Sequence, residues 1–206
     1  MKIEQHPFNG LEKILDFLSD NLVQPEAIRE FPIRDYFDKY AETVKTVKYT
    51  PFDLSLMHMK EYFERNIILP NNISYKLIWD VDKLKEIISK NHISVVALDL
   101  YERKNDITYS IENIDNYVLK NEPIILGEMG IMKTNLILDG NHRITYYFEN
   151  RIQRINAYYL LSSLHYEAIV GEFMRRLFVL HNNIYKIQCF MCGYIDNLNE
   201  HLIDIS

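Results

Sequence analysis

The stretch from Asn135 to Glu149 constrains the fold more than any other part of the chain, because it combines a strand, a tight turn and a helix in few residues. Its first part, Asn135–Leu138, is short and apolar and is bounded by polar residues, which predicts a buried strand. Apolar residues recur at helical spacing from Asn141 on, which predicts a helix. Gly140 lies between the two and supplies the backbone freedom that a tight strand-to-helix turn requires.

The beginning of this predicted helix has the properties of an anion site. Its first N–H groups have no partner within the helix, and the helix dipole places partial positive charge at the turn. His142 and Arg143 add donors in the first helical turn, which favours the binding of phosphate. A purely structural interpretation stays open here, since Asp139 before a helix is often an N-cap and Gly140-Asn141 is often a simple turn.

A family resemblance favours the phosphate interpretation. The run Asp139-Gly140-Asn141-His142-Arg143 resembles the Asp-Gly-x-His-Arg signature of the ParB/sulfiredoxin superfamily. Pro123–Gly127 resembles the strand that precedes this motif in the family, and Arg154–Leu160 resembles the strand that follows its helix. The resemblance covers Ile93 to Leu161, which is about a third of the chain.

The resemblance implies that the turn binds the phosphates of a nucleotide, which is ATP in sulfiredoxins, CTP in ParB clamps, and ADP or ATP in ParB-like free-serine kinases. By position, Gly140, Asn141, His142 and Arg143 would hold phosphate, with Arg143 as the fixed positive charge. Asp139 would hold a metal ion or accept a proton from an attacking hydroxyl group. The expected cofactors are therefore a nucleoside di- or triphosphate (ATP, ADP or CTP) and Mg²⁺.

The chain departs from two branches of the family. Sulfiredoxins have a catalytic cysteine where this chain has Asn141, and because asparagine is no nucleophile for that chemistry, sulfiredoxin activity is not expected. ParB clamps have an acidic-arginine-arginine form of the motif and a helix-turn-helix domain, and no convincing helix-turn-helix follows Leu161. The resemblance is therefore nearest to the kinase-like branch.

A phosphotransferase also needs a base or an orienting carboxylate for the attacking hydroxyl group. The predicted strand Ile93–Leu100 is followed by a charged loop, and in the resembling fold this loop lies near the phosphate turn. We predict Glu102 as the base and Arg103 as a second phosphate contact, with Glu128 as the reserve candidate for the base. The alternative is that these charged residues are simply solvated.

Composition bounds the partners and the compartment. The net charge of −6 over 206 residues disfavours a protein that mainly grips nucleic acid, so DNA is not the expected partner. No apolar run is long enough to span a bilayer, and the first residues lack the apolar core of a signal peptide. With only two cysteines, the chain is expected to be cytoplasmic and without a membrane partner.

The two cysteines have the spacing of a metal or redox pair. Zinc usually needs four ligands, no second cysteine pair exists, and His181 and His201 would complete a site with Cys189 and Cys192 only by unusual geometry. A redox role is also disfavoured, because the pair lacks a preceding strand. We therefore predict no metal site built by the protein alone.

The chain as a whole is predicted to be α+β, with a small mixed β-sheet core of the ParB/sulfiredoxin type flanked by N-terminal and C-terminal helices. The predicted divisions are a mostly helical region 1–91 packed on the core, a nucleotide-binding core 92–161, and C-terminal helices 162–206. The N-terminal region is predicted to include a helix that begins at Thr50-Pro51 and has Phe63 on its buried face. A further helix is predicted to be capped by Asp80. The strand Ile93–Leu100 is apolar enough to be central in the sheet.

Further helices are predicted on either side of the core. The periodic residues Ile111, Ile114, Tyr117 and Val118 predict one before the strand at Pro123. Ser162 or Ser163 begins a long helix, Asn182-Asn183 interrupts it, and a last helix follows from Ile184.

Two functions of different classes follow. The first is an enzyme that transfers phosphate from a nucleotide to a small hydroxyl-containing acceptor, with the phosphates held at Gly140–Arg143. The second is a regulatory module without catalysis, which senses a nucleotide in the same pocket and contacts protein or DNA through its flanking helices.

Overall fold

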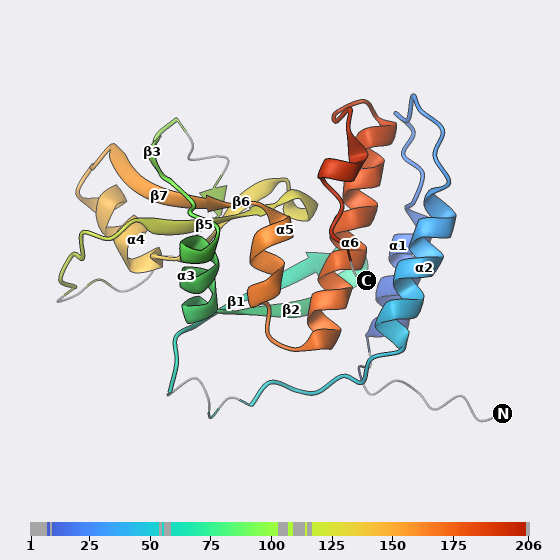
Figure 1. Ribbon diagram of the computed structural model, residues 1–206, viewed down its shortest axis with the longest axis horizontal. Helices are drawn as coiled ribbons and strands as arrows, with labels where there is room; N and C mark the ends of the chain where they lie inside the picture. Colours follow the sequence, from blue (N-terminus) through green and yellow to red (C-terminus); the bar gives the residue numbers. More distant parts are fainter. Residues whose placement is uncertain are drawn as a thin grey trace. The chain divides into compact units, whose positions relative to one another are not determined.

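The structure is a computed structural model, and it describes residues 8, 10–53, 55, 59–102, 107–108, 114 and 117–204, without the side chain of Asn71 (Figure 1). The chain is α+β, as predicted, with a five-stranded mixed sheet, a two-stranded antiparallel sheet and six α-helices among these residues. It forms two compact units, each built from segments that are distant in sequence. Unit 1 comprises Met1–Met59, Glu64–Ile78 and Ile169–Ser206, and unit 2 comprises Lys60–Phe63 and Trp79–Ala168.

The five-stranded sheet forms the centre of unit 2. Its strand order is β3-β7-β5-β6-β4. The pairs β3–β7 and β5–β6 are antiparallel, whereas β5–β7 and β4–β6 are parallel, so the sheet is mixed. The strands are β3 (Val95–Asp99), β4 (Ile107–Thr108), β5 (Ile124–Met129), β6 (Thr134–Asp139) and β7 (Arg154–Leu160).

The strands β5 and β6 form an antiparallel hairpin directly before the motif turn. A 3-10 turn over Gly130–Met132 joins them, and Lys133 closes the turn in the left-handed conformation with φ 53°. The register pairs Met129 with Thr134. The hairpin places the carboxyl end of β6, and therefore the motif turn, beside the beginning of β5.

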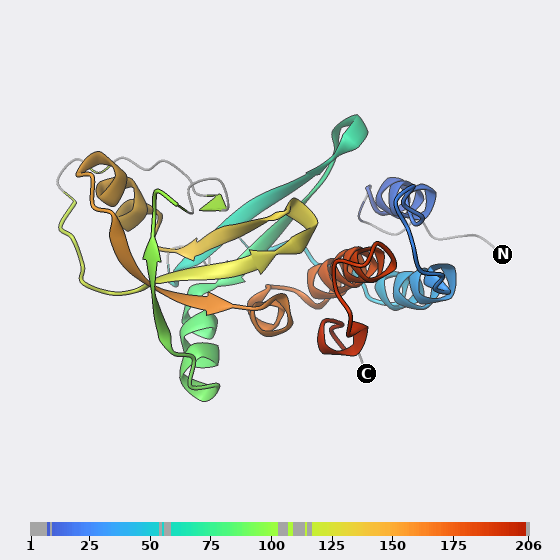
Figure 2. The same ribbon diagram turned by 90° about the horizontal axis from the view of Figure 1, so that it is seen from above.

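Helices cover both faces of this sheet (Figure 2). Helix α4 (Asn141–Glu149) packs on one face through Ile144, which joins a cluster of buried aliphatic residues. Helices α3 (Val81–Lys90) and α5 (Ser162–His165) lie on the other. The cluster under α4 consists of Leu100, Ile107, Ile124, Leu126, Ile137, Ile144, Ile155 and Ala157.

The structure corrects the predicted position of one strand in unit 2 and confirms the predicted cap of one helix. The apolar strand predicted to be central is β3, and it lies at the edge of the sheet, where Val95 and Val96 are exposed. Apolarity alone does not fix strand order, because the central positions go to the strands that both helical layers cover. The predicted cap of α3 is confirmed: the Asp80 carboxylate accepts a hydrogen bond from the Lys83 amide at 3.1 Å.

The helix predicted to begin at Thr50-Pro51 and run through Phe63 is wrong. Residues 50–53 form no helix, and Phe63 belongs to β1 (Tyr62–Leu69), which pairs with β2 (Ile73–Asp80). Capping signals stabilise a helix by only about 1 kcal/mol, so the pairing of two strands overrides them. Within this pair, Lys76 and Glu64 form an ion pair at 2.9 Å.

The helix predicted from Ile111 to Val118 falls largely outside the described residues. Ile114 and residues 117–120 are described, and they are not helical. Tyr117 is instead held by contacts with the motif helix, which are described below.

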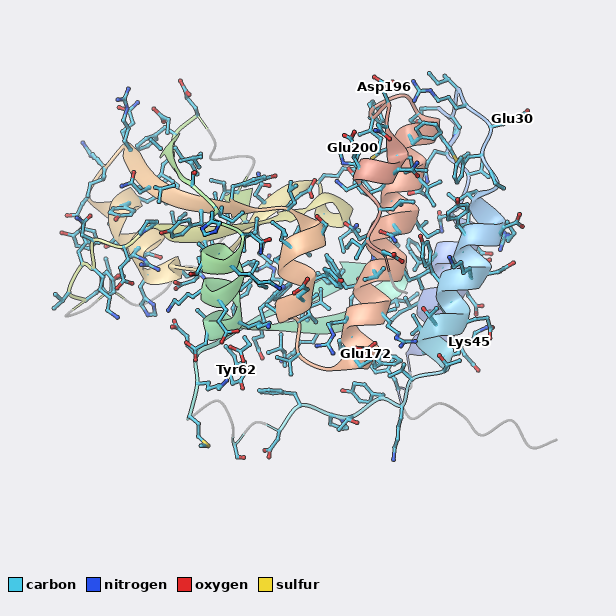
Figure 3. All side chains as sticks on the ribbon, in the orientation of Figure 1. Glu30, Lys45, Tyr62, Glu172, Asp196 and Glu200 are labelled. Atoms are coloured by element: carbon cyan, nitrogen blue, oxygen red, sulfur yellow. The ribbon has the colours of Figure 1, made fainter. Side chains whose placement is uncertain are left out.

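Unit 1 contains the helices α1 (Leu11–Asp20), α2 (Ile33–Lys45) and α6 (Glu172–Met191), drawn in blue and red in Figure 1. The interruption predicted at Asn182-Asn183 is wrong, because α6 runs through both residues. The break lies earlier, at Gly171, whose φ of 84° no helix interior adopts. Glu172 opens α6 (Figure 3), and its carboxylate binds Arg175 at 2.8 Å and Arg176 at 2.7 Å.

Asn183 is tolerated inside α6 because its side-chain amide forms hydrogen bonds with both backbone groups of Ile203. Its Nδ2 donates to the carbonyl of Ile203 at 2.8 Å, and its Oδ1 accepts from the amide of Ile203 at 2.9 Å. The side chain is fully buried. The asparagine thus binds the C-terminal segment to the helix as a neighbouring strand would.

We predict that Asn183→Ala lowers the free energy of unfolding by about 2–4 kcal/mol, because it leaves two buried backbone groups of Ile203 without their partner. Asn182→Ala is the matched control: Asn182 Oδ1 is buried without a hydrogen-bond partner in the described part of the chain, and its Nδ2 makes only a long 3.4 Å hydrogen bond to Asn183 Oδ1. Urea unfolding followed by circular dichroism measures both variants. Equal losses for the two would contradict the assignment.

Buried His165 makes the stability of unit 2 depend on pH. The indole N–H of Trp79 donates to His165 Nδ1 at 3.3 Å, and His165 Nε2 donates to the carbonyl of Glu128 at 2.8 Å. Burial lowers the pKa of His165 to about 4 from its ordinary 6.5. Between these values the unfolded chain takes up a proton that the folded chain does not, so stability is complete above pH 6.5 and is lost as the pH falls toward 4.

We therefore expect unit 2 to lose about 2 kcal/mol of stability between about pH 7 and pH 5. Trp79 is the only tryptophan and is fully buried in this unit, so its fluorescence during urea unfolding is the measurement. An unfolding midpoint that is the same at both pH values would show that His165 is not held neutral.

Candidate phosphate-binding site

The motif turn adopts a conformation that requires glycine. Gly140 lies between β6 and α4 with φ 104° and ψ 24°, in the left-handed region. A Cβ atom on it would lie 2.6 Å from Cγ2 of Ile124 and 2.9 Å from Nε of Arg143. The carbonyl of Gly140 accepts the first helical hydrogen bond, from the amide of Ile144 at 2.9 Å. This bond begins the ladder of α4, and the amides before Ile144 are the donors predicted from the sequence to bind an anion.

Arg143 is buried and already paired with acidic groups. Its Nη2 lies 2.9 Å from Oδ2 of Asp139, and its side chain is only 5% exposed. Its Nη1 lies 3.3 Å from both the carbonyl and Oε2 of Glu122. The Asp139 side chain is 11% exposed, whereas that of Glu122 is 61% exposed. Asp139 therefore holds the guanidinium from the inside, and Glu122 is the partner that solvent can reach.

The motif residues line a cavity of about 260 Å³. Asp139 and all four residues predicted to hold phosphate, Gly140–Arg143, lie on its wall. The structure thus brings the predicted residues of the turn together around one space. Residues of β1 and α3 also line the cavity, among them Tyr62, which is labelled in Figure 3.

An aromatic group borders the same cavity. The imidazole of His142 stacks on the ring of Tyr117, with centroids 5.6 Å apart and an angle of 17° between the planes. Tyr146 packs against the other side of this contact, 6.2 Å from Tyr117. Burial raises the pKa of the Tyr117 hydroxyl above its ordinary value. His142 thereby has a fixed orientation at the rim, and Tyr62 and Phe63 add further aromatic surface.

Two lysines on this wall were not found from the sequence. Lys85 comes from α3 and lies 3.7 Å from Glu61, with its side chain half exposed. Lys120 precedes β5 and forms no ion pair with a described residue. The sequence pattern that could have pointed to Lys85 is its position four residues after Val81, at the edge of the apolar stripe of α3. No sequence pattern points to Lys120 or Glu122, because they belong to an irregular segment.

A larger cavity of about 680 Å³ adjoins the first. It is bordered by α3, by the turn at His92 and Ile93, by the beginning of β5 and by Tyr158 of β7. Three residues line both cavities: Lys85, Glu122 and Asp139.

The predictions outside the turn have different outcomes. Glu102 is exposed in the turn after β3 and is not among the described residues that line the two cavities. Its amide donates to Oδ1 of Asp99 at 3.1 Å, and this hydrogen bond lowers the pKa of the Asp99 carboxyl group. Arg103 lies outside the described residues. Glu128 accepts hydrogen bonds from the amide and the hydroxyl of Ser162, at 3.1 and 3.0 Å, which is a capping contact at the start of α5.

Cys189 and Cys192 are free thiols at the end of α6. In the described part of the chain, no group of three or more His, Cys, Asp and Glu residues is placed to hold a metal ion. None of the described helices combines the length and the apolar character that crossing a membrane requires.

Comparison of this chain with protein-family models, with curated proteins and with solved structures finds no match. The interpretation of the site therefore depends on its own residues and geometry.

The turn predicts a specific effect of Gly140→Ala. The left-handed conformation and the 2.6 Å approach to Ile124 together should lower the free energy of unfolding by about 2–4 kcal/mol. Gly10→Ala is the control, because Gly10 has a φ of −112° and an added Cβ would lie at an ordinary 3.4 Å from Phe8. Urea unfolding of both variants tests this, and a Gly140→Ala variant as stable as the control would refute the assigned backbone conformation.

Proposed function

We propose that unit 2 is a ParB/sulfiredoxin-like nucleotide-binding domain that transfers phosphate from a nucleotide to a small hydroxyl-containing acceptor. The observation that carries this proposal is the 260 Å³ cavity, in which a glycine turn at a helix N-terminus, His142, Arg143 and two lysines surround one space. Helix N-termini, arginine and lysine are the groups with which proteins bind phosphate. The strand–turn–helix context of the motif supports the family resemblance.

The phosphates would be bound by two kinds of donors, backbone amides and positively charged side chains. The amides at the start of α4 supply fixed donors, and Lys120 and Lys85 supply mobile positive charge. Arg143 contributes once a phosphate oxygen replaces the carboxylate of Glu122, which is the exposed and longer of its two acidic contacts. Asp139 keeps the guanidinium in place throughout.

The carboxylates on the wall fit a role for Mg²⁺. Mg²⁺ is usually bound through one or two carboxylates together with substrate phosphates, rather than by a cage of protein ligands alone. Asp139 borders the cavity beside the turn, so it is the residue that would hold the ion through the oxygen that does not bind Arg143. The ion would neutralise the charge that phosphates bring close to these carboxylates.

Glu122, rather than Glu102, would serve as the base. It lines the space in which the phosphates would lie, and its carboxylate, once displaced from Arg143, can accept the proton of an attacking hydroxyl group. Glu102 has no place in either cavity wall among the described residues, and its backbone already serves the turn after β3.

The second candidate function is a nucleotide-sensing module without catalysis. It is favoured by the pairing of charges in the site, where Arg143 is held by two acidic groups and Lys85 by Glu61. Such a site can bind a nucleotide by exchanging ion pairs and signal this change to a protein or DNA partner. Light scattering with and without nucleotide tests it, since a sensing module should change its oligomeric state or its partner binding.

The free thiols bear on the compartment in the proposed function. Cys189 and Cys192 are unpaired, which is typical of proteins in a reducing environment. A nucleotide-dependent enzyme with free thiols fits the cytoplasm, and we include this location in the proposal.

We predict that the chain binds ATP, ADP or CTP in the presence of Mg²⁺, and that Lys120→Gln weakens binding about tenfold, or about 1.4 kcal/mol. Lys85→Gln should have a similar effect. Lys90→Gln is the matched control, since Lys90 is an exposed lysine of α3 whose side chain borders neither cavity in the described structure. Calorimetric titration of ATP, ADP, CTP and GTP measures the affinities and identifies which nucleobase the chain prefers.

The same titration, together with an assay of phosphate transfer, distinguishes the enzyme, the sensing module and a chain that binds no nucleotide. Binding that Lys90→Gln weakens as much as Lys120→Gln does would mean that the affinity comes from general charge and not from this cavity. Binding by the wild type without turnover of any acceptor would favour the sensing module. An absence of binding by the folded wild type would refute both functions.

A further inference from the structure

The larger cavity has a position that the phosphate site alone does not explain. It shares Lys85, Glu122 and Asp139 with the smaller cavity, so a molecule in one space and a molecule in the other would meet at these three side chains. Two carboxylates and one lysine at such a meeting point are the groups that a transfer between two bound molecules requires.

The lining of the larger cavity indicates the kind of molecule that would occupy it. Ile88, Ile93 and Ile125 give it apolar walls, and Ser89, His92 and Tyr158 add polar groups. Among its described lining residues, the charged groups are the carboxylates of Glu122 and Asp139 and the ammonium group of Lys85. This balance disfavours a second phosphate group and favours a molecule that is uncharged or carries an ammonium group.

The smaller cavity is the better place for the nucleotide. It contains the helix N-terminus, Arg143 and Lys120, and its aromatic residues Tyr62, Phe63 and Tyr117 offer surface for a base. The larger cavity has one aromatic residue among its described lining, Tyr158. The division of residues thus separates a nucleotide side from an acceptor side.

We propose that the larger cavity is the acceptor subsite, and that the acceptor is a small alcohol with an apolar body that is uncharged or carries an ammonium group. This inference depends on the proposed phosphotransfer. The hydroxyl oxygen of the acceptor forms a bond to the γ-phosphorus of ATP at the junction, and the bond from that phosphorus to the β,γ-bridging oxygen breaks. ADP leaves with the electron pair, and the hydroxyl proton passes to the carboxylate of Glu122, which the phosphate has displaced from Arg143.

Filling the larger cavity tests this proposal. Ser89→Trp places an indole in the acceptor subsite from α3, and Glu86→Trp is the matched control, because Glu86 lies on the same helix with a side chain that is 71% exposed. ATP with Mg²⁺ is titrated into each variant, and phosphate transfer is measured with 1-butanol and 4-amino-1-butanol as acceptors and with glycerol 3-phosphate as the anionic comparison.

The proposal predicts that Ser89→Trp binds ATP as the wild type does but transfers phosphate at least twentyfold more slowly, while Glu86→Trp does both normally. Unchanged transfer by Ser89→Trp would overturn it. Loss of ATP binding by Ser89→Trp would also overturn it, since the cavity would then hold the nucleotide.

Three further outcomes separate this proposal from the phosphotransfer on which it depends. Preferential use of glycerol 3-phosphate would overturn the assigned acceptor class alone. ATP binding by the wild type without transfer to any of the alcohols would overturn the acceptor subsite and leave a nucleotide-binding module. Failure of the wild type to bind any nucleotide would refute the proposed function itself.

Discussion

The ion pair between Arg143 and Asp139 closes the strand–turn–helix on which the site depends. Arg143 reaches back from the first turn of α4 to the last residue of β6, at 2.9 Å, and both side chains are almost completely buried. Such a pair adds little net stability, but removing one partner leaves a buried charge uncompensated at a cost of about 3–5 kcal/mol. The pair therefore fixes the geometry of the turn more than it stabilises the unit, and Gly140 makes that geometry accessible to the backbone.

The second property of the site is that its charges are balanced before any ligand binds. Arg143 forms ion pairs with Asp139 and Glu122, and Lys85 forms one with Glu61. Asp139 and Glu122 line both cavities, so both carboxylates lie where the two cavities meet. A phosphate would enter by displacing Glu122, the exposed partner, while Asp139 stays in place. In the proposed function, nucleotide binding would release a carboxylate at the point where a second molecule would lie.

The sequence predicted the parts of the fold that local patterns determine. The strand predicted at Asn135–Leu138, the helix after Gly140 and the cap at Asp80 each follow from a few neighbouring residues. The structure has all three, with the strand extended to Thr134–Asp139. The edge position of β3, the strand β1 in place of a helix and the passage of α6 through Asn183 depend on partners far away in the chain. For the same reason the motif turn was found as a candidate site, whereas Lys85, Lys120 and Glu122 were missed, since only the fold brings them to the turn.

The central claim is that the amides at the start of α4 hold phosphate. The most direct measurement is a nuclear magnetic resonance titration of the ¹⁵N-labelled chain with tripolyphosphate and with ATP and Mg²⁺. The account predicts that the amide signals of Gly140, Asn141, His142 and Arg143 shift most with both ligands, because the phosphates bind there and the base does not. Shifts confined to other parts of the chain, with these four amides unchanged, would contradict it.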